Sequence, residues 1–190
     1  MAQREKFWLG TPPGPPPEPA DISKPKTIAE SAVTTSRPAT LLDANGHGNV
    51  HGGVIMRWID ETAAMVAVKH CRRPVVTARI DRLDFLAPAY LGHLINIHAS
   101  LSYVGRTSMQ VDVLVTGEDP MTGEIRKICS SDVVFVALGE DTRPTAVPPL
   151  APANQEERER MERARIRREH LKRIEEELKK DEPAFPSPLP

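Results

Sequence analysis

The residues of this chain that could do chemistry gather in one short stretch, from Gly48 to Glu61. Two glycines, Gly52 and Gly53, open an apolar run, and a carboxylate, Asp60, follows seven positions after the second glycine. Amide groups at a helix N-terminus are unpaired and carry a partial positive charge, so they suit an oxyanion or a phosphate. A carboxylate among apolar neighbours needs a partner or a catalytic task. The stretch therefore predicts a site that combines backbone N–H donors with one acid.

A single helix does not bring these two groups together. Residues seven apart share a helix face but lie about 10 Å apart along the axis. A two-fold dimer resolves this by placing the Gly52–Gly53 end of one subunit near Asp60 of the other. The competing interpretation is that Asp60 only forms an ion pair with Arg57 or Arg79. The adjacent acid, Glu61, points about 100° away, and a structural ion pair or an interface contact is expected for it.

Histidines and cysteines give little support for metal chemistry. His47 and His51 lie in a glycine-rich loop with no cluster of carboxylates, and His70 lies near a helix end. Polar histidines close to a ligand are the better interpretation, so no metal is expected. The two cysteines, Cys71 and Cys129, form no Cys-x-x-Cys pair, which predicts unpaired thiols in a reducing compartment.

Size and charge limit the functional classes. The chain has 190 residues, with 25 Lys and Arg against 26 Asp and Glu, so no basic excess favours nucleic acid or an anionic membrane. We find no window with the length of a transmembrane span and no apolar core of a signal peptide. Nucleophile-elbow, phosphate-loop and dinucleotide motifs are also missing. We expect a soluble, cytoplasmic protein.

Composition divides the chain into four segments. Residues 1–25 are proline-rich and predicted to be disordered, and a plain spacer is favoured there over a ligand for a proline-reading domain. Residues 26–145 are predicted to form the folded domain, and residues 146–182 a linker and a charged helix. Residues 183–190 are a second proline-rich end, predicted to be disordered.

Within the folded domain, the hydrophobic pattern predicts one long helix and about five strands. Residues 52–69 are apolar around much of a helix, whereas the strand-like segments are 27–42, 75–86, 93–104, 109–115 and one ending at 133–138. In the segment 93–104 one face is predicted to carry Ile95, Ile97, Ala99, Leu101 and Tyr103. Short turns between consecutive strands favour antiparallel hairpins. The expected fold is α+β, a curved antiparallel sheet around one buried helix.

The C-terminal region is predicted to be a charged helix. Asn154 can cap it, with Glu157 three residues later as in a capping box. The thin apolar stripe of Leu171, Ile174 and Leu178 favours a helix that lies on the core or on a neighbouring subunit, rather than a coiled coil. Favourable pairs four residues apart are expected at Glu156/Arg160, Glu159/Arg163, Glu169/Arg173 and Glu175/Lys179.

The central stretch resembles a known family. Gly48-Asn49-Val50-His51-Gly52-Gly53, followed by Met56 and Ile59-Asp60-Glu61, is similar to the hotdog-fold acyl-CoA thioesterases. Within them it is similar to the cytosolic long-chain (brain) acyl-CoA hydrolases and their single-domain bacterial relatives. The resemblance covers residues 27–177 and extends to the segment 82–88, the helix end at His70-Cys71 and the charged helix. It implies a hotdog fold, with one long helix wrapped by a curved sheet of about five strands.

The resemblance also implies a reaction and an assembly. Asn49 of one subunit would act with Asp60 of its partner, in a homodimer with two complete sites, and three dimers would form a hexamer. The reaction would be hydrolysis of acyl-CoA to a fatty acid and CoA, with Asp60 as general base or, alternatively, as nucleophile. No metal or redox cofactor would be required. The alternative function is a non-catalytic sensor of acyl-CoA or nucleotide, and a dehydratase is disfavoured because its aspartate–histidine pair is not evident.

Further residues are candidates for contacts with the substrate because of their positions in the chain. The N–H groups of Gly52 and Gly53 would meet the oxyanion, where one lost donor costs about 3 kcal/mol of barrier. His51 would lie beside the ligand. Arg82 and Arg106, with Ser108 in the same turn as Arg106, are candidates for the CoA phosphates, and solvation at the surface is the alternative for each arginine.

Overall fold

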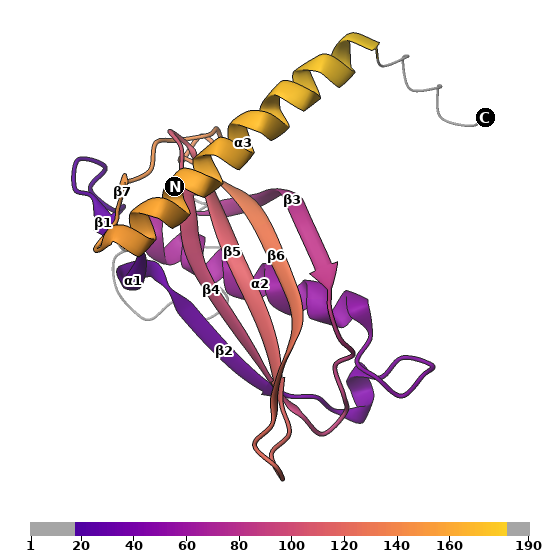
Figure 1. The fold of residues 1–190 in the computed structure, drawn as a ribbon. Coiled ribbons are helices and arrows are strands. Elements are labelled where there is room, and N and C mark those ends of the chain that lie inside the picture. The colour runs from indigo at the N-terminus through magenta and orange to yellow at the C-terminus, as the bar shows by residue number, and fades with distance from the viewer. Residues whose placement is uncertain (1–17, 182–190) are drawn as a thin grey trace.

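One long helix is wrapped by a curved five-stranded sheet in the computed structural model, which describes residues 18–181 (Figure 1). Of the segments predicted to be disordered, residues 1–17 and 183–190 lie outside the described residues. The prediction is wrong for residues 18–25, which form a turn in which the Lys24 N–H donates to the Asp21 carbonyl at 3.2 Å, and the Ala20 N–H donates to the Cys71 carbonyl at 3.3 Å. The sheet order is β2-β4-β5-β6-β3, and every neighbouring pair is antiparallel. The elements are β1 (Lys26–Thr27), α1 (Ile28–Ser31), β2 (Val33–Pro38), a 3-10 turn (Leu41–Asp43), α2 (Gly52–Cys71), β3 (Val75–Phe85), β4 (Leu94–Val104), β5 (Ser108–Glu118), β6 (Ile125–Ala137), β7 (Leu150–Ala151) and α3 (Gln155–Asp181). The predicted α+β hotdog fold is confirmed.

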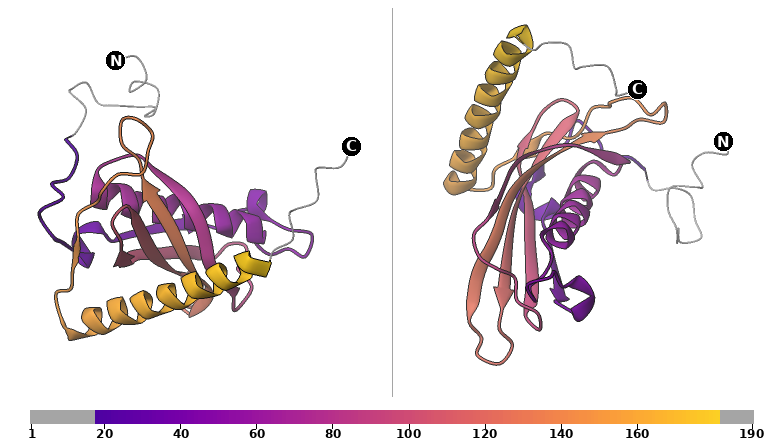
Figure 2. Two further views of the ribbon diagram at one scale, coloured as in Figure 1. Left: turned by 90° about the horizontal axis from the view of Figure 1, so that it is seen from above. Right: turned by 90° about the vertical axis from the view of Figure 1, so that its right-hand side faces the viewer.

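The two long helices lie on opposite sides of the sheet (Figure 2). Helix α2 packs on the concave side, which we call the inner side, and α3 lies across the convex, outer side. The core between α2 and the sheet is hydrocarbon, with fully buried Ile55, Ile59, Ile95, Ile97, Val111 and Phe135. Burial of such side chains drives the sheet to curve around the helix. The apolar core on the inner side therefore stabilises the fold, and the candidate site lies at the edge of this core.

The predicted strand over 27–42 is wrong in its first part. The structure contains a short helix, α1, between β1 and β2. Thr27 caps this helix in a reciprocal capping box, in which the backbone N–H of Thr27 donates to Glu30 Oε2 at 2.6 Å and the Glu30 N–H donates to Thr27 Oγ1 at 3.4 Å. The β-branched composition favoured a strand, but this local capping signal overrides it.

Strand β4 contains an irregularity that the alternating pattern does not reveal. Its pairing with β5 shifts between Leu101 and Tyr103, so Leu101 pairs with Val111 whereas Tyr103 pairs with Gln110. Adjacent residues of β5 point to opposite sides of the sheet. Tyr103 therefore lies on the outer side, where the guanidinium carbon of Arg168 is 5.5 Å from its ring centroid. The predicted shared face of Tyr103 with Leu101 is wrong because of this bulge.

Helix α3 begins as predicted but pairs its charges differently. Asn154 Oδ1 accepts the Glu157 N–H at 2.9 Å, which confirms the cap. The Glu159–Arg163 pair is confirmed at 3.8 Å. Two of the other predicted pairs are replaced, because Arg160 pairs with Asp112 and Glu169 pairs with Arg165. Glu175 pairs with Arg79 of β3, and its predicted pair with Lys179 is not tested. Lys179 lies outside the described side chains. The helix thus lies on the core, held by charges that reach the sheet.

Candidate active site

The loop that precedes α2 is organised by one asparagine, Asn45. Its side-chain Oδ1 accepts the backbone N–H groups of His47 at 2.8 Å and Asn49 at 3.2 Å, and its own N–H donates to the Asn49 carbonyl at 2.7 Å. Gly48 adopts a positive φ of 78°, which a glycine tolerates at no cost. Asn45 and Asn49 are both half-buried. The loop therefore holds two asparagine side chains next to the start of the helix.

The N-terminus of α2 is shaped by His51 and Phe85. His51 is the N-cap, and its Nδ1 accepts the Gly53 N–H at 2.9 Å. A methyl group on Gly52 would lie 3.4 Å from the ring of Phe85, which comes from β3, so the ring packs directly against the helix start. The Gly53 N–H is therefore already occupied by the histidine. An anion that uses it must first displace His51.

Asp60 faces a hydroxyl on β3, and we consider this pair the centre of the site. Thr77 Oγ1 donates to Asp60 Oδ1 at 2.6 Å. Asp60 is half-buried and Thr77 is exposed, so the pair lies at an opening between α2 and the last strand of the sheet. A short hydrogen bond from a hydroxyl to a carboxylate is charge-assisted and fixes the orientation of the acid. The second oxygen of Asp60 remains available.

The predicted ion-pair alternatives for Asp60 are not found among the described side chains. Arg57 lies 3.9 Å from Glu61, and Arg79 pairs with Asp81 and Glu175. Glu61 also accepts a hydrogen bond from Arg37 at 2.9 Å, which confirms its predicted structural ion pair. Asp60 is thus a carboxylate without a cation, next to one that is fully engaged.

The predicted phosphate-binding residues fall into two separate places. Arg106 lies in the turn between β4 and β5, and Ser108 is the first residue of β5. Ser108 Oγ accepts a hydrogen bond from Arg168 of α3 at 3.2 Å. Arg82 lies on β3, where its Nε is 3.4 Å from Asp84 and 3.7 Å from Asp132. Arg82 is therefore engaged by two acids, whereas Arg106 lines a pocket under α3.

The remaining titratable candidates have structural partners. His70 is fully buried, its Nε2 donates to the Pro148 carbonyl at 2.9 Å, and its Nδ1 accepts from Ser31 Oγ at 3.0 Å. Burial lowers the pKa of His70, which is thereby kept neutral. Both cysteines are free, as predicted, and both are buried. Within residues 18–181, no group of three potential ligands could hold a metal, and no helix is long and apolar enough to cross a membrane.

The edge of the sheet beside the Asp60–Thr77 pair exposes apolar groups. Strand β3 is the last strand of the sheet, so one side of its backbone has no partner strand. Its exposed apolar side chains, including that of the residue that follows it, are Val76, Ile80, Phe85 and Leu86. An edge strand with exposed apolar side chains is a ready surface for a second chain.

Comparison with known proteins identifies the family. Residues 47–124 match the model of the Thioesterase superfamily. An uncharacterized acyl-CoA thioester hydrolase of Bacillus subtilis is 38% identical over 128 residues, which are 67% of this chain and 74% of the relative. The chain belongs to the thioesterase superfamily. It is therefore a hydrolase of thioesters, as the resemblance implies. The cytosolic acyl coenzyme A thioester hydrolase of Rattus norvegicus is 32% identical, and the match covers 76% of this chain but only 38% of the rat protein.

Solved structures of superfamily members have the same architecture. The acyl-CoA hydrolase of Staphylococcus aureus, in complex with butyryl coenzyme A and coenzyme A, matches with a TM-score of 0.74 and 33% identity, over 83% of this chain and 98% of that one. A hexameric acyl-CoA thioesterase matches with a TM-score of 0.76 and 34% identity, over 81% of this chain and 97% of that one. Three variants of the Staphylococcus aureus enzyme carry alanine in place of an aspartate, of an asparagine fifteen residues before it, and of a threonine seventeen residues after it.

Two polar residues of the candidate site were missed by sequence reasoning. Thr77 is seventeen residues after Asp60, and the packing of α2 against β3 brings the two side chains together. Asn45 lies four residues before Asn49 and was treated only as part of a loop. Its signal was present, because an asparagine whose side chain accepts backbone N–H groups two and four residues later is a common loop organiser.

Proposed function

We propose that this thioesterase hydrolyses acyl-CoA to a fatty acid and CoA, at a site to which two copies of the chain contribute. The observation that carries the proposal is the bond from Thr77 Oγ1 to Asp60 Oδ1 at 2.6 Å, at an opening on the β3 edge. The acyl-CoA specificity is supported by the Staphylococcus aureus relative, whose structure contains butyryl coenzyme A.

Asp60 acts as the general base in this proposal. Its free oxygen takes a proton from water as the water oxygen attacks the thioester carbonyl carbon. The tetrahedral intermediate collapses, the carbon–sulfur bond breaks, and the proton returns to the CoA sulfur. No cation of the side chains that the structure describes pairs with Asp60, so its charge is not shared with a stronger partner. Direct attack by Asp60 to form an anhydride is the alternative route.

Two asparagines compete for the role of positioning the water or the thioester. Asn49 is the residue predicted from the sequence motif, and no observation tests it. Asn45 lies fifteen residues before Asp60, and Thr77 lies seventeen residues after it, which are the spacings of the residues substituted in the Staphylococcus aureus enzyme. The spacing therefore favours Asn45, and Asn49 remains the second candidate.

Gly52 is the better of the two proposed oxyanion donors. The Gly53 N–H donates to His51 Nδ1, whereas no hydrogen bond engages the Gly52 N–H among the described residues. Gly52 lies beneath the Phe85 ring, which excludes water from one side of that amide. Donors in a dry environment stabilise an oxyanion more than donors in water. His51 controls access to the second donor.

A homodimer is proposed to complete the site. The exposed apolar side chains along β3, with Ile80 at 42% and Phe85 at 50% exposure, support pairing of two sheets at this edge. Such a two-fold arrangement brings the loop that holds Asn45 toward the partner's helix. A trimer of dimers is supported by the hexameric relative. A cytoplasmic location is supported by the cytosolic rat relative.

The substrate-binding roles of His51, Arg82, Arg106 and Ser108 remain proposals. Arg106 and Ser108 fit the CoA phosphates better than Arg82, because Arg82 is already paired with Asp84 and Asp132. The reaction as proposed uses water and side chains of this chain, without a metal or redox cofactor.

Release of free CoA from acyl-CoAs of graded chain length tests the proposal. Alanine variants at Asp60, Asn45 and Asn49 are compared, with Glu61→Ala as the control on the same helix. We expect turnover to be lost in the Asp60 variant and in only one of the two asparagine variants. Mixing the Asp60 and asparagine variants should restore turnover in heterodimers if the site is shared. Full turnover by Asp60→Ala would refute the mechanism, whereas absence of turnover by the wild type would leave the sensor alternative to be tested by ligand binding.

A further inference from the structure

Helix α3 continues past the sheet on which it lies. Its first turns cross the outer side of the sheet, and its C-terminal turns project beyond it (Figure 1). We call residues 171–178 the arm. The arm is tied to the sheet by the ion pair of Glu175 with Arg79. Arg79 belongs to β3, the last strand of the sheet, so no described strand of the same chain lies beyond it. The arm therefore extends over the space next to an open sheet edge.

The face of α3 that meets the sheet does not end where the sheet ends. Residues seven apart lie on the same face of a helix. Ala164 is buried, Leu171 is half-buried and Leu178 is exposed, although all three share one face. This face therefore leaves the protein surface along the arm while it remains apolar.

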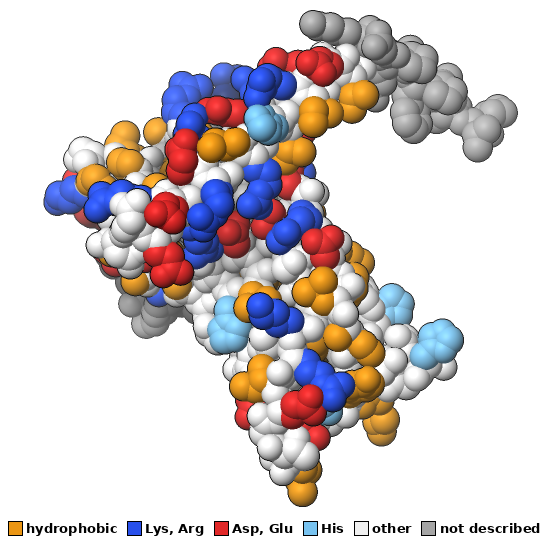
Figure 3. Space-filling view, in the orientation of Figure 1, with side chains coloured by type: hydrophobic (Ala, Val, Ile, Leu, Met, Phe, Trp, Pro, Cys, Tyr) orange, Lys and Arg blue, Asp and Glu red, His pale blue; other side chains and the backbone are white. Residues whose placement is uncertain are grey.

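A second row on the same side of α3 changes from charged to apolar. Arg160 and Arg167, which are seven residues apart, form ion pairs with acids of β5 and β6. Ile174 follows Arg167 after another seven residues and is 51% exposed. Hydrophobic side chains are visible along the projecting part of α3 (Figure 3). An apolar stripe on an otherwise charged, projecting helix predicts a contact with another molecule.

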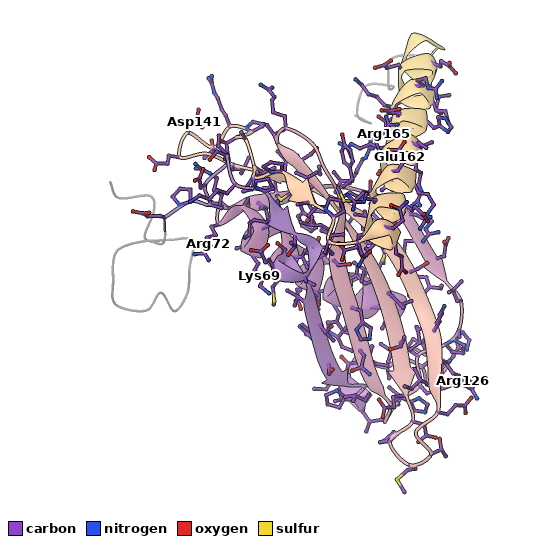
Figure 4. All side chains as sticks on the ribbon, turned by 60° about the vertical axis from the view of Figure 1, so that its left-hand side comes forward. Lys69, Arg72, Arg126, Asp141, Glu162 and Arg165 are labelled. Carbon is purple, nitrogen blue, oxygen red and sulfur yellow. The ribbon has the colours of Figure 1, made fainter. Side chains whose placement is uncertain are left out.

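The other faces of α3 are solvated. Arg165 pairs with Glu162 at 2.6 Å, and the two side chains lie beside each other on the helix (Figure 4). Ile166 lies two residues after Ala164 and therefore on the far side of the helix from the sheet. Its exposure of 41% is similar to that of Ile174. Ile166 thus provides a comparison for the stripe within the same helix.

The open edge of β3 indicates what lies beneath the arm. In the proposed dimer two β3 edges pair, and both α2 helices lie on the same side of the joined sheet, because the shared site draws on both. A two-fold axis normal to the sheet meets this condition, and it makes the two strands antiparallel. The N-terminal half of β3, which contains Arg79, then lies beside the C-terminal half of β3 in the second copy. The arm therefore extends over the outer side of that copy.

We propose that the arm is a clamp across the dimer, which packs Leu171, Ile174 and Leu178 on the outer side of the second copy's sheet. The receiving surface is the segment from Arg82 to Leu86 of that copy. Leu86 is exposed, and the side chain of Arg82, whose hydrocarbon stem can cover an apolar group, is half exposed. The two-fold axis makes the contact reciprocal, so each copy covers the stripe of the other. The inference rests on the dimer of the proposed function, but not on its chemistry.

Two other occupants compete for the stripe. The first is the arm of another copy in a coiled coil, for which three apolar residues are too few. The second is the segment of residues 1–17 of the same chain. Only the sheet of a second copy also accounts for an arm that projects past an unpaired edge strand.

Dissociation of the full-length dimer on dilution, measured by mass photometry, is the first test. Ile174→Glu places a charge in the stripe, and Ile166→Glu places the same charge outside it at similar exposure. Circular dichroism verifies that both variants fold. We expect the dimer dissociation constant to rise about tenfold in Ile174→Glu and to change less than about twofold in Ile166→Glu. Equal dissociation constants in the two variants would overturn the proposal.

Photo-crosslinking then locates the contact. The full-length protein carries p-benzoylphenylalanine in place of Leu178, or in place of Ile166 as the control, and copies with heavy nitrogen are mixed with unlabelled copies. We expect position 178 to cross-link to residues 82–86 in peptide pairs that combine the two labels, and position 166 to form no such pairs. Cross-links that never combine the labels, or that join the arm to residues 1–17 or to another arm, would overturn the proposal.

Release of CoA from acyl-CoA by the same samples separates this inference from the proposed hydrolysis. A wild type that hydrolyses acyl-CoA while its arm cross-links only within its own copy would refute the clamp alone. A wild type whose arm cross-links to the second copy without any hydrolysis would refute the proposed reaction and support the clamp. A wild type that is monomeric at all concentrations would overturn the clamp, whatever its activity.

Discussion

Two carboxylates on opposite sides of the sheet have opposite environments. Asp60, on the inner side, accepts one hydrogen bond from the Thr77 hydroxyl and has no cation among the described side chains. Asp132, on the outer side, is 2% exposed and lies 2.7 Å from Arg167 and 3.7 Å from Arg82. A carboxylate that is held by two arginines serves to attach elements to each other. A carboxylate with a single hydroxyl partner keeps an oxygen free for a proton.

The surroundings of these two acids differ in the same way. Charged side chains of both signs crowd over α3 and the sheet beneath it (Figure 3). There Arg160 pairs with Asp112 at 3.2 Å, next to the pair of Arg167 and Asp132. Burial, and then the neighbouring Asp112, raise the pKa of Asp132 against the opposing effect of its arginines. On the outer side a carboxylate is therefore desolvated where it holds α3 on the sheet. On the inner side one carboxylate lies at an opening.

The largest effect should separate the two acids by activity. We expect Asp60→Asn to lower kcat by about 10³-fold, because general-base catalysis contributes typically 10²–10⁴-fold. Asp132→Asn should keep kcat within about twofold, since a paired acid does no chemistry. CoA release measured with a thiol reagent checks both. Equal losses in the two variants would remove the functional contrast between the acids.

The second effect should separate them by stability. Asp132→Ala leaves Arg167 and Arg82 without their buried partner, and we expect a cost of about 2 kcal/mol, moderated because both arginines can turn to solvent. Asp60→Ala should cost less than about 1 kcal/mol, because it removes one hydrogen bond at an opening. Urea unfolding of both variants measures the difference. A larger cost at Asp60 would mean that it is the structural acid.

The hydroxyl partner of Asp60 can be tested in the same manner. Thr77→Val keeps the shape of the side chain but removes the donor, and we expect about a tenfold loss in kcat from the disoriented acid. Thr62→Val is the matched control, because Thr62 is buried on α2 and its hydroxyl forms a hydrogen bond with the Thr35 hydroxyl at 2.9 Å, away from Asp60. That control should lower stability and preserve kcat. If Thr77→Val lowered stability and preserved kcat, Thr77 would have a packing role alone.

A smaller effect concerns the loss of folding stability at acidic pH, which we attribute to His70 rather than to Asp60 or Asp132. Burial lowers the pKa of His70, so the folded state keeps it neutral while the unfolded chain takes up a proton near the ordinary value of 6.5. Stability is therefore full above that value and is lost as the pH falls toward the lowered folded pKa. Lys26, Glu30 and Ser31 face the same ring. His70→Gln should flatten the dependence of the urea midpoint between pH 7.5 and 5, and an unchanged slope would exclude His70 as its cause.

The smallest effect should be a response of the outer side to salt. The contacts of α3 with the sheet include three partly exposed ion pairs, those of Arg160, Arg167 and Arg79. Salt screens such pairs, whereas it hardly affects the apolar packing of α2. We expect hydrogen exchange of α3 amides to rise by about twofold in 0.5 M sodium chloride, with α2 as the internal reference. Equal changes in both helices would show that charge is not what distinguishes them.

The sequence predicted the parts of the fold that depend on regular patterns. The helix from Gly52 and the order of strands after it follow from apolar periodicity and short turns. Residues 27–42 and Tyr103 were misassigned because a four-residue helix and a one-residue bulge leave the average pattern almost unchanged. Such features are decided by single capping bonds and by the pairing of strands. Neither can be read from alternation alone.

The candidate site was predictable in its helix but not in its surroundings. Asp60 and the glycines could be proposed because they interrupt an apolar run in one segment. Thr77 lies on another element, and its side is set by the register of β3 with β6. Arg82 is paired with acids whereas Arg106 lines a pocket, and this difference likewise depends on which acids the fold places beside each guanidinium. Long-range neighbours of this kind are fixed only by tertiary packing.

The single extra residue in β4 has a consequence for how this chain can change over evolutionary time. The Leu101 side chain packs in the hydrocarbon core, whereas the Tyr103 side chain lies on the surface beneath α3. Deleting one residue there would turn the tyrosine back inward without altering any side chain of α2 or β3. Loss of one codon could therefore reshape the surface beneath α3, while the residues of α2 and β3 were inherited unchanged.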